Sequence, residues 1–380
     1  MDGKNLANRE VLLFLPSFGS GGCEAFVVNV AVSLKELGWN PFIISIGEKE
    51  TVYDNKLKKA KIERSVLLRN CNLNPAVLYV RAYRAWARFL ANNPKRYSVV
   101  HFNIAQGEEL PFVWMAKRCG IPVRILHSHN SQTNGRIKLW GHVLCKAMFG
   151  DVATHYLSCS HIAAEWNFPT EIISNKSYAL IGNGIDTEAF RFNEAMRAVK
   201  RAELEVGSAH VYLNVGRLHR QKNQMFLLEV FSKILEEDSN ALLLIVGAGE
   251  LEGELKSRAN SIGVASKVRW IKSCEDMPSI YWASDVFLLP SLFEGFPFSL
   301  IEAQAAGLPC VVSDLVSEQC AITDLCRFVP LVEDVFVNAS MEALTRSVLD
   351  RVIFCNEVAS NGYDVNVTTR KLLEIYEESL

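Results

Sequence analysis

The sequence predicts an α/β protein made of two doubly wound domains, each with a parallel sheet between layers of helices. The chain has 380 residues, which exceeds the usual size of a single domain. Its first segments alternate as strand, glycine-rich loop, helix and strand, and its second half repeats strand, loop and helix several times. Such alternation requires parallel strands with right-handed crossovers, and ligands bind these sheets at the carboxyl ends of the strands.

The N-terminal domain is expected over residues 1–186. Its first strand, 11–15, runs into a loop in which Gly21 and Gly22 leave room for a ligand to approach the backbone. A plain tight turn is the alternative interpretation of this loop. Further strands are expected at 42–46, 99–103, 123–126, 156–160 and 178–181, and helices at 24–37, 75–91 and 108–118.

The C-terminal domain is expected over residues 187–366, after a turn-rich segment that marks the boundary. Gly307 ends an expected helix over 299–306, because glycine is a frequent helix C-cap. The amphipathic final helix, about 367–380, is expected to pack back onto the N-terminal domain. Strands of the C-terminal domain are expected at 211–215, 241–246, 268–271, 285–289 and 309–312.

The two halves of the chain carry opposite net charge. Residues 1–190 hold 22 Lys/Arg and 15 Asp/Glu, a net charge of +7, whereas residues 191–380 hold 18 and 27, a net charge of −9. A basic N-terminal half favours an anionic partner such as a membrane surface or a lipid pyrophosphate, although charge can also drift between domains without function. The sequence contains no nucleic-acid recognition module, so nucleic acid is not expected as a partner.

Composition also bears on the compartment. No apolar run reaches the roughly 18 residues of a membrane span, and the polar first ten residues do not resemble a signal peptide. The ten cysteines have no paired spacing, so we expect reduced thiols in the core. These features predict a cytoplasmic protein. The basic N-terminal half adds the expectation of peripheral contact with the inner face of the cytoplasmic membrane.

The helix expected at 75–91 supplies a possible membrane contact. Arg81, Arg84 and Arg88 fall on one helical face. A basic face flanked by aromatic side chains can lie on an anionic membrane, although such a face is more often simply solvated. The interleaved aromatic residues are Tyr79, Tyr83, Trp86 and Phe89.

Charged residues follow the strands of the C-terminal half. Arg217 and Lys222 come five residues apart after Gly216, and this pair suits a diphosphate, because Arg grips phosphate oxygens with a fork and Lys acts as a mobile charge. Glu294 and Glu302 bracket a loop and a helix start with seven residues between them. Carboxylates accept hydrogen bonds from vicinal hydroxyls, and a helix N-terminus favours an anion. Together these features predict a sugar-nucleotide site.

A second cluster follows the strand at 123–126. His127 and His129 lie at its carboxyl end, and Asn130 follows them. A histidine there lies in the expected ligand crevice, although a lone histidine is more often structural.

The stretch from Glu294 to Glu302, EGFPFSLIE, resembles the E-x7-E motif of the retaining glycosyltransferases of family 4. The resemblance spans essentially the whole chain. It implies the GT-B fold, in which two Rossmann-like domains face each other across a cleft. HSHN at 127–130 is similar to bacterial members that build capsular, exo- or lipopolysaccharide. Other segments similar to family landmarks are Gly216-Arg217 with Lys222, Asn183-Gly-Ile-Asp186 and Gly21-Gly-Cys-Glu24.

The resemblance also implies roles for individual residues. Arg217 and Lys222 would stabilise the departing diphosphate, Glu294 would contact the donor sugar, and Glu302 would bind the ribose. One of the two histidines would lie near the reacting sugar, and His129 is favoured because it precedes Asn130. The implied catalytic set is His129, Glu294, Arg217 and Lys222, with His127 and Asn130 on the acceptor side. The implied donor-binding set is Gly21, Gly22, Gly216, Arg217, Lys222, Gly249, Glu294, Gly295, Phe296, Pro297, Phe298 and Glu302.

The expected function is therefore a retaining transfer of a sugar from a nucleoside diphosphate sugar, with uridine as the expected base. The acceptor is expected to be a lipid-linked glycan or an oligosaccharide in bacterial surface polysaccharide biosynthesis. No metal and no cofactor are expected, because Arg217 and Lys222 take the place of a cation. The alternatives are a GT-B sugar-nucleotide epimerase and a non-catalytic sugar-nucleotide-binding subunit.

Overall fold

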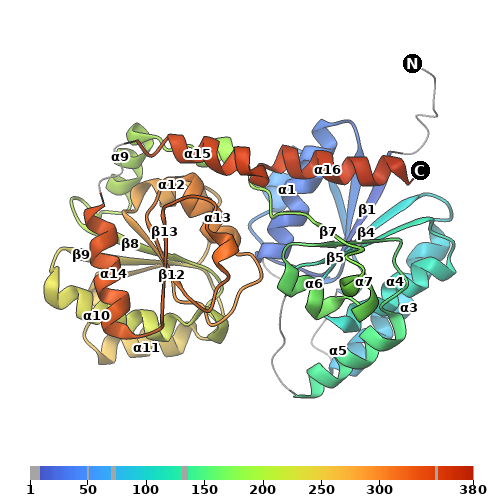
Figure 1. Ribbon diagram of the computed structural model, residues 1–380, viewed down its shortest axis with the longest axis horizontal. Helices are drawn as coiled ribbons and strands as arrows, with labels where there is room; N and C mark the ends of the chain where they lie inside the picture. The colour runs from blue at the N-terminus through green and yellow to red at the C-terminus, as the bar shows by residue number, and fades with distance from the viewer. Residues whose placement is uncertain (1–8, 49–50, 70–73, 131–135, 347–349, 380) are drawn as a thin grey trace. The chain divides into compact units, whose positions relative to one another are not determined.

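The computed structural model describes residues 9–48, 51–69, 74–130, 136–346 and 350–379. The chain forms two units: unit 1 comprises Met1–Gly184 and Val365–Leu380, and unit 2 comprises Ile185–Asp364. The chain passes from unit 1 to unit 2 after Gly184 and returns after Asp364. Both boundaries lie two residues before those expected from the sequence. Each unit has a parallel sheet covered by helices (Figure 1), which confirms the predicted fold class.

Unit 1 is built on a seven-stranded parallel sheet in the order β3-β2-β1-β4-β5-β6-β7. The edge strand β3 was not expected, because its sequence, ERSV, is mostly polar and half-exposed. The strands are β1 (Glu10–Phe18), β2 (Asn40–Glu48), β3 (Glu63–Val66), β4 (Val99–Ile104), β5 (Val123–Ser128), β6 (His155–Ser158) and β7 (Ala179–Leu180).

The helices of unit 1 cover both faces of this sheet (Figure 1), and the C-terminal helix α16 packs against α1. Gly21 is the N-cap of α1 and Gly38, at a φ of 83°, follows its end. These helices are α1 (Gly22–Glu36), α2 (Asp54–Lys59), α3 (Pro75–Asn92), α4 (Leu110–Arg118), α5 (Arg136–Phe149), α6 (His161–Asn167), α7 (Thr170–Ser174) and α16 (Val365–Glu378), with the 3₁₀ turn η1 (Gly107–Glu109).

The alternation of side chains along β4 assigns the two faces of the sheet. Val100 and Phe102 join the core cluster beneath α3 and α4. His101 and Asn103 point to the opposite face, where the His101 ring meets Tyr376 of α16 and Phe26 of α1. Successive side chains of a strand alternate between faces, so one strand contributes both to an apolar core and to a polar cluster.

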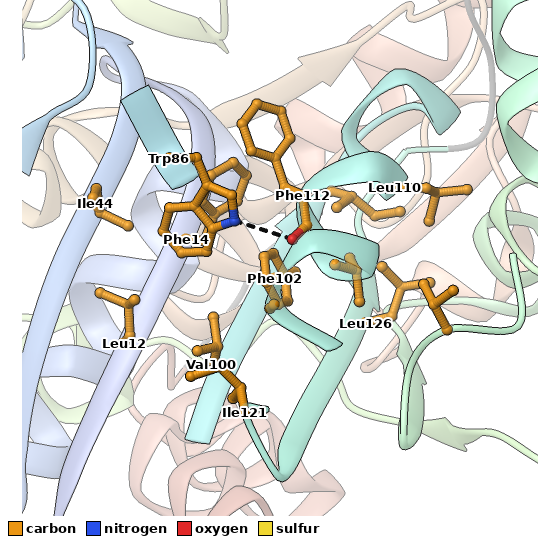
Figure 2. Packing of buried hydrophobic residues seen from close by; sticks show 14 of the residues in the cluster. Leu12, Phe14, Ile44, Trp86, Val100, Phe102, Leu110, Phe112, Ile121 and Leu126 are labelled. Carbon is orange, nitrogen blue, oxygen red and sulfur yellow. Dashed lines mark hydrogen bonds between the residues drawn. The ribbon is translucent and has the colours of Figure 1, made fainter. Parts of the chain in front are cut away.

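The apolar face of unit 1 is centred on Trp86 of α3. Its indole is fully buried and packs edge-on against Phe14 of β1, with ring centroids 5.4 Å apart. The indole Nε1–H donates to the backbone carbonyl of Phe112 at 3.1 Å, as Figure 2 shows. A buried indole therefore keeps its hydrogen bond while it adds a large apolar surface to the core.

This packing corrects the expectation for α3. Arg81, Arg84 and Arg88 are exposed as expected, but the aromatic side chains do not flank them at the surface. Besides Trp86, which lies in the core, the other three pack partly buried against the same cluster: Tyr79, Tyr83 and Phe89. The aromatic residues of this helix therefore stabilise the fold, and its exposed side carries the three arginines together with Val77 and Val80.

Unit 2 contains a six-stranded parallel sheet in the order β10-β9-β8-β11-β12-β13. Five of the strands lie where the sequence predicts them, and β13 was missed. The strands are β8 (His210–Val215), β9 (Ala241–Val246), β10 (Val268–Ile271), β11 (Val286–Leu289), β12 (Cys310–Ser313) and β13 (Cys326–Val329).

The helices of unit 2 also form two layers. α10, α11 and α14 pack on the core cluster of this sheet, whereas α13 contacts α8, α12 and α15. The helices are α8 (Thr187–Phe190), α9 (Glu194–Glu203), α10 (Gln224–Glu237), α11 (Glu252–Ser261), α12 (Met277–Ala283), α13 (Phe298–Ala305), α14 (Glu333–Thr345) and α15 (Ile353–Val358). The turns are η2 (Arg220–Lys222), η3 (Ala265–Lys267), η4 (Glu318–Cys320) and η5 (Ala359–Tyr363).

The two chain crossings are each anchored within a unit. In unit 2, the N–H of Ile185 donates to the carbonyl of Tyr363 at 2.9 Å, and Ile185 pairs with Asp364 in a parallel bridge. In unit 1, Gly184 lies so close to α16 that a Cβ there would be 2.5 Å from Oγ1 of Thr368. The turn that the sequence marked as a landmark therefore lies directly against the returning chain.

The structure also tests the expectations of reduced, buried cysteines and of a chain without a membrane-spanning helix. Nine cysteines lie in the described residues and all are free, but only Cys159, Cys310, Cys320 and Cys355 are buried. The expectation of free thiols is confirmed for these nine cysteines. The expectation that they lie in the core is confirmed for the four buried ones. Among the described residues, no helix combines the length and the apolarity that a membrane crossing requires.

Candidate functional site

The loops after β8 and β9 pack against each other at the carboxyl edge of the unit 2 sheet. A Cβ at Gly249 would collide with the carbonyl oxygen of Leu218, and one at Gly247 would collide with that of Gly216. The N–H of Leu218 donates to the carbonyl of Ala248 at 3.1 Å. Glycine is needed because the two backbones touch, so Gly249 fixes the shape of this edge.

An ion pair joins the loop after β8 to the loop after β11. The Lys222 Nζ lies 2.6 Å from the Glu294 Oε1, and the two side chains are only 15% and 9% exposed. Gly216 makes room for the lysine, because a Cβ there would be 2.8 Å from the Lys222 Cε. The Gln221 Nε2 donates to the carbonyl of Phe293 at 2.9 Å, which fixes the same two loops together. Lys222 and Glu294 are thus held in one geometry.

Arg217 differs from Lys222 in being exposed. Its backbone carbonyl accepts a hydrogen bond from the Gln224 Nε2 at 3.1 Å, which fixes the main chain at this position. Within the described ranges, its guanidinium pairs with no carboxylate. The edge therefore offers one cation held by a carboxylate and a second cation that a phosphate could bind with two hydrogen bonds.

The helix α13 begins beside this pair. Pro297 is its N-cap, and Phe298, its first residue, is buried. Glu302 lies one turn into the helix, and its Oε2 accepts a hydrogen bond from the Tyr281 hydroxyl at 2.7 Å. Burial, reinforced by the Glu302 charge, raises the pKa of Tyr281 well above its ordinary value, so Tyr281 remains a donor. The tyrosine thus fixes the position of one oxygen of this carboxylate.

The loop between Glu294 and α13 is braced by an aromatic stack. The rings of Phe296 and Tyr363 lie parallel with centroids 5.1 Å apart, and Phe296 is almost fully buried. The stack thus anchors the loop Gly295–Phe298 through the side chain of Phe296. Phe296 and Phe298 act through packing, while the main chain of this loop remains the part that a ligand could contact.

Unit 1 has its own polar cluster at the carboxyl ends of β1, β4 and β5. The Tyr376 hydroxyl lies 2.7 Å from the His101 Nδ1, and the His101 Nε2 lies 3.1 Å from the His127 Nδ1. The ring of His129 follows, with its centroid 4.1 Å from that of His127. Phe26, near the start of α1, packs against both of these last rings. The glycine-rich start of α1 and the histidines thus belong to one edge.

The histidines of this cluster are neutral. Burial lowers the pKa of His101 and of His129 to about 3, and it lowers the pKa of His127 as well. The His129 Nε2 lies 2.9 Å from the Asn103 Oδ1, and the Asn103 Nδ2 donates to the carbonyl of Phe14. An amide oxygen only accepts, so the His129 Nε2 carries the proton and its Nδ1 carries a lone pair.

The structure therefore brings most of the expected residues together in two places. In unit 2, neighbouring loops of one sheet edge and the first turns of α13 carry Gly216, Arg217, Lys222, Glu294 and Glu302. In unit 1, His129 belongs to the histidine cluster and half-buried Asn130 follows it, while Gly21 and Gly22 begin α1, the helix whose Phe26 packs against the His129 ring.

His127 requires a correction. It was expected on the acceptor side, but it has no exposed surface and is hydrogen-bonded to His101. His127 therefore supports the cluster from within, because a fully buried ring cannot touch an acceptor.

Several residues of these clusters were missed by sequence reasoning. His101 and Asn103 alternate with core residues along β4, and this period of two was a signal available in the strand VVHFNI. Tyr281 and Tyr376 lie in helices whose apolar pattern gave no sign of a polar partner. Their hydroxyl groups reach the clusters only through tertiary packing.

Comparisons with known proteins agree with this geometry. Residues 196–324 match the family model described as glycosyl transferases group 1, and this segment contains all the expected unit 2 residues. The chain is 27% identical to the putative glycosyltransferase EpsF of Bacillus subtilis, over 99% of this chain and 98% of the relative. It is 28% identical to UDP-Gal:alpha-D-GlcNAc-diphosphoundecaprenol alpha-1,3-galactosyltransferase of Escherichia coli, over 74% and 76% of the two chains.

A solved structure has the same fold. The crystal structure of Anabaena Alr3699/HepE in complex with UDP and glucose aligns with a TM-score of 0.76, at 16% identity, over 97% of this chain and 99% of that one. The chain is therefore a glycosyltransferase with the GT-B fold, and its unit 2 carries a glycosyl transferases group 1 domain.

Proposed function

We propose that this glycosyltransferase moves a sugar from a UDP-sugar to a lipid-linked glycan acceptor with retention of the anomeric configuration, in the biosynthesis of a bacterial surface polysaccharide. The observation that carries the proposal is the Lys222–Glu294 ion pair beside the exposed guanidinium of Arg217. The pair places a positive charge and a hydroxyl-binding carboxylate at the same edge of the sheet. A nucleoside diphosphate sugar carries both complementary groups.

The chemistry of the leaving group explains the two cations. Breaking the anomeric C–O bond leaves negative charge on the diphosphate, and fixed cations stabilise that charge more in the transition state than in the ground state. Lys222 is already held in place by Glu294, so little reorganisation is required at the moment of reaction. In this proposal Arg217 and Lys222 do the work that a divalent cation does in other transferases.

The carboxylates would orient the donor. Glu302 has one oxygen fixed by Tyr281 and would bind the ribose hydroxyls. Glu294, fixed by Lys222, would bind hydroxyls of the donor sugar beside the backbone of Gly295–Phe298. In unit 1, the neutral His129 would accept a hydrogen bond from a substrate hydroxyl through the lone pair of Nδ1.

The nature of donor and acceptor is supported by the relatives. The name of the Escherichia coli relative specifies a UDP-galactose donor and a diphosphoundecaprenol-linked acceptor, and the Anabaena structure contains UDP and glucose. The basic N-terminal half of this chain suits a lipid pyrophosphate, and it also suits peripheral contact with an anionic membrane.

A ligand panel tests the donor site. Binding to the native state raises the melting temperature, so UDP and UDP-sugars are expected to raise it and GDP and GDP-sugars to raise it less. The same shift should vanish in the Arg217→Ala variant. Equal shifts of the melting temperature for all nucleotides would contradict the assignment of uridine as the base. An unchanged shift in the Arg217→Ala variant would contradict the assignment of the donor site.

A product analysis tests the reaction. With a polyprenyl-diphosphate sugar as acceptor, transfer is expected to yield the same anomer as the donor, read by nuclear magnetic resonance, and to continue in the presence of EDTA. Loss of activity with EDTA that added Mg²⁺ restores would contradict the metal-independent mechanism. Epimerisation of a UDP-sugar in the absence of acceptor would favour the isomerase instead.

A further inference from the structure

Among the described residues of unit 1, helix α5 carries a stripe of apolar side chains that are exposed. Trp140 is 75% exposed and Leu144 is 60% exposed. The residues of the stripe recur at the spacing of one helical face, and we refer to them as the α5 stripe: Leu139, Trp140, Val143, Leu144 and Met148. Single exposed apolar residues are ordinary, but a contiguous group that includes a tryptophan marks an interaction surface.

The opposite side of α5 explains why the stripe faces outward. The His142 Nδ1 accepts a hydrogen bond from the N–H of Gly107 at 2.9 Å, and its Nε2 lies 2.9 Å from the carbonyl of Trp166. The His142 ring also stacks on the Trp166 ring, with centroids 4.1 Å apart. These contacts fix the rotation of the helix about its axis, so the stripe cannot turn inward.

The exposed surface continues onto α4. Trp114 is also exposed, and its ring packs against Phe149 of α5 with centroids 5.8 Å apart. The Arg118 guanidinium lies 5.5 Å from the centre of the Trp114 ring, and Lys117 and Arg118 are exposed. The α5 stripe and this end of α4 therefore form one surface, the α4–α5 face, in which apolar rings adjoin cations.

Positive charge dominates the sequence around the α4–α5 face, although the carboxylate of Glu108 lies beside Gly141 of α5. From residue 110 to residue 150 the sequence contains six Lys/Arg and no Asp/Glu. This composition complements an anionic surface. It also disfavours a second copy of the same face, because an isologous contact would bring like charges together.

We propose that the α4–α5 face docks on an anionic lipid bilayer, with Trp140 and Leu144 at the level of the headgroups and the cations of α4 on lipid phosphates. Tryptophan at an interface combined with basic residues is the pattern of a peripheral membrane surface. The proposal rests on the proposed function, since a lipid-linked acceptor lies in such a bilayer. It moves the docking surface away from α3, whose aromatic side chains pack in or against the core.

Vesicle sedimentation tests the proposal without donor or acceptor. The full chain is mixed with phosphatidylcholine vesicles that contain or lack phosphatidylglycerol. Wild-type protein is expected to pellet with the anionic vesicles and to be released by salt. Leu144→Glu is expected to weaken binding at least about tenfold, because it removes apolar burial and adds a repelled charge. The control Val199→Glu, on a 49% exposed valine of α9 in unit 2, is expected to bind as wild type.

Two further measurements separate the outcomes. Thermal unfolding and the UDP-induced shift of the melting temperature are expected to be equal in Leu144→Glu and wild type, so a folding defect or a failed donor site is recognised independently. Brominated lipids should quench tryptophan fluorescence in the wild type and less in Trp140→Phe. No wild-type sedimentation, or equal binding by Leu144→Glu and wild type, would overturn the proposal. A wild-type dimer in lipid-free buffer that Leu144→Glu converts to a monomer would also overturn it, in favour of a protein interface.

Discussion

The Arg217 guanidinium and the Lys222 ammonium carry charges of the same sign but stand in different environments. Lys222 is paired with Glu294 and nearly buried, whereas Arg217 is exposed. Removing Lys222 leaves a carboxylate with little access to water, and this has a stability cost. Removing Arg217 takes away a group that makes no ion pair within the described residues. The two substitutions should therefore separate catalysis from stability.

We predict that Arg217→Ala lowers kcat/KM for sugar transfer by about 10²- to 10³-fold, the usual effect of losing one transition-state charge contact, with an unchanged melting temperature. Lys222→Ala should lower both kcat/KM and the melting temperature. Steady-state kinetics and calorimetry on the two variants provide the comparison. A melting temperature that falls equally in both would contradict the distinction between the two cations.

The neutral histidines of unit 1 make its stability sensitive to acid. His101 has a pKa of about 3 in the folded chain against an ordinary value of 6.5. Below pH 6.5 the unfolded state binds a proton that the folded state does not bind, so stability is complete above this pH and falls as the pH falls towards 3. At pH 5 the loss amounts to about 2 kcal/mol for each such histidine.

We predict that the unit 1 transition of His101→Gln loses about 2 kcal/mol less than that of the wild type between pH 7.5 and pH 5. Urea unfolding at the two pH values, followed by the fluorescence of unit 1 tryptophans, measures the difference. His210→Gln, on a surface strand end of unit 2, serves as the control and should leave the unit 1 difference unchanged. An equal loss in wild type and His101→Gln would mean that His101 is protonated in the folded chain.

Among the elements, α3 shows how one helix divides its residues between packing and charge. Its sequence alternates arginine and aromatic residues, and the pattern alone allowed both kinds of side chain to lie at the surface. Trp86 instead lies in the core, where it gains both a large apolar contact and a hydrogen bond to Phe112, and the other three rings pack partly buried against it.

We predict that Trp86→Ala destabilises unit 1 by about 3–5 kcal/mol, since a large buried ring leaves a cavity. Arg84→Ala, about half a turn away on the exposed side of the helix, should change the stability by less than about 0.5 kcal/mol. Denaturant unfolding of both variants tests this contrast. A small effect of Trp86→Ala would show that the neighbouring side chains of β1, β4 and α4 can close the cavity.

The elements also mark where sequence reasoning succeeds. Apolar strands such as Ala241–Val246 and helices ended by glycine, such as the one before Gly307, were predictable because local pattern and local geometry agree. The edge strand β3 and the helix α5 were not predicted. β3 is polar because one of its edges meets solvent, and α5 has apolar residues on its outer side, which contradicts the usual amphipathic rule.

The positions of the charged residues in the candidate site were also predictable from local sequence, but the positions of their hydrogen-bond partners were not. Arg217, Lys222, Glu294 and Glu302 follow strands or start a helix, so the position of each is fixed by local sequence. Tyr281 and Gln221, which donate hydrogen bonds to Glu302 and Glu294, could not be identified, because a hydrogen bond between side chains of different elements depends on packing distances that no local pattern contains.

At the scale of the whole molecule, the chain passes from unit 1 into unit 2 at Gly184 and returns at Val365. The closeness of Gly184 to α16 depends on the absence of a side chain. A Cβ would lie 2.5 Å from the Thr368 hydroxyl oxygen and 2.8 Å from the Cα of Val365, and the backbone atom cannot move away cheaply.

We predict that Gly184→Ala destabilises unit 1 by about 1–3 kcal/mol by pushing α16 away from α1. Gly253→Ala in α11 is the matched control, because a Cβ there meets no atom within 4 Å, and it should stabilise unit 2 by about 0.5–1 kcal/mol through helix propensity. Hydrogen exchange of α16 amides locates the effect. Unchanged protection of α16 in Gly184→Ala would contradict the proposed displacement.

The return of the chain to unit 1 has a consequence for synthesis on the ribosome. The sheet of unit 1 is translated first, but α16, whose Tyr376 hydrogen-bonds to His101 in that sheet, is translated after all of unit 2. Unit 2 can therefore complete its fold before α16, the last helix of unit 1, has been synthesised. During that interval the α1 face of the first sheet is uncovered where α16 will lie, and His101 lacks its tyrosine partner. The unit that emerges first is thus the one that is finished last.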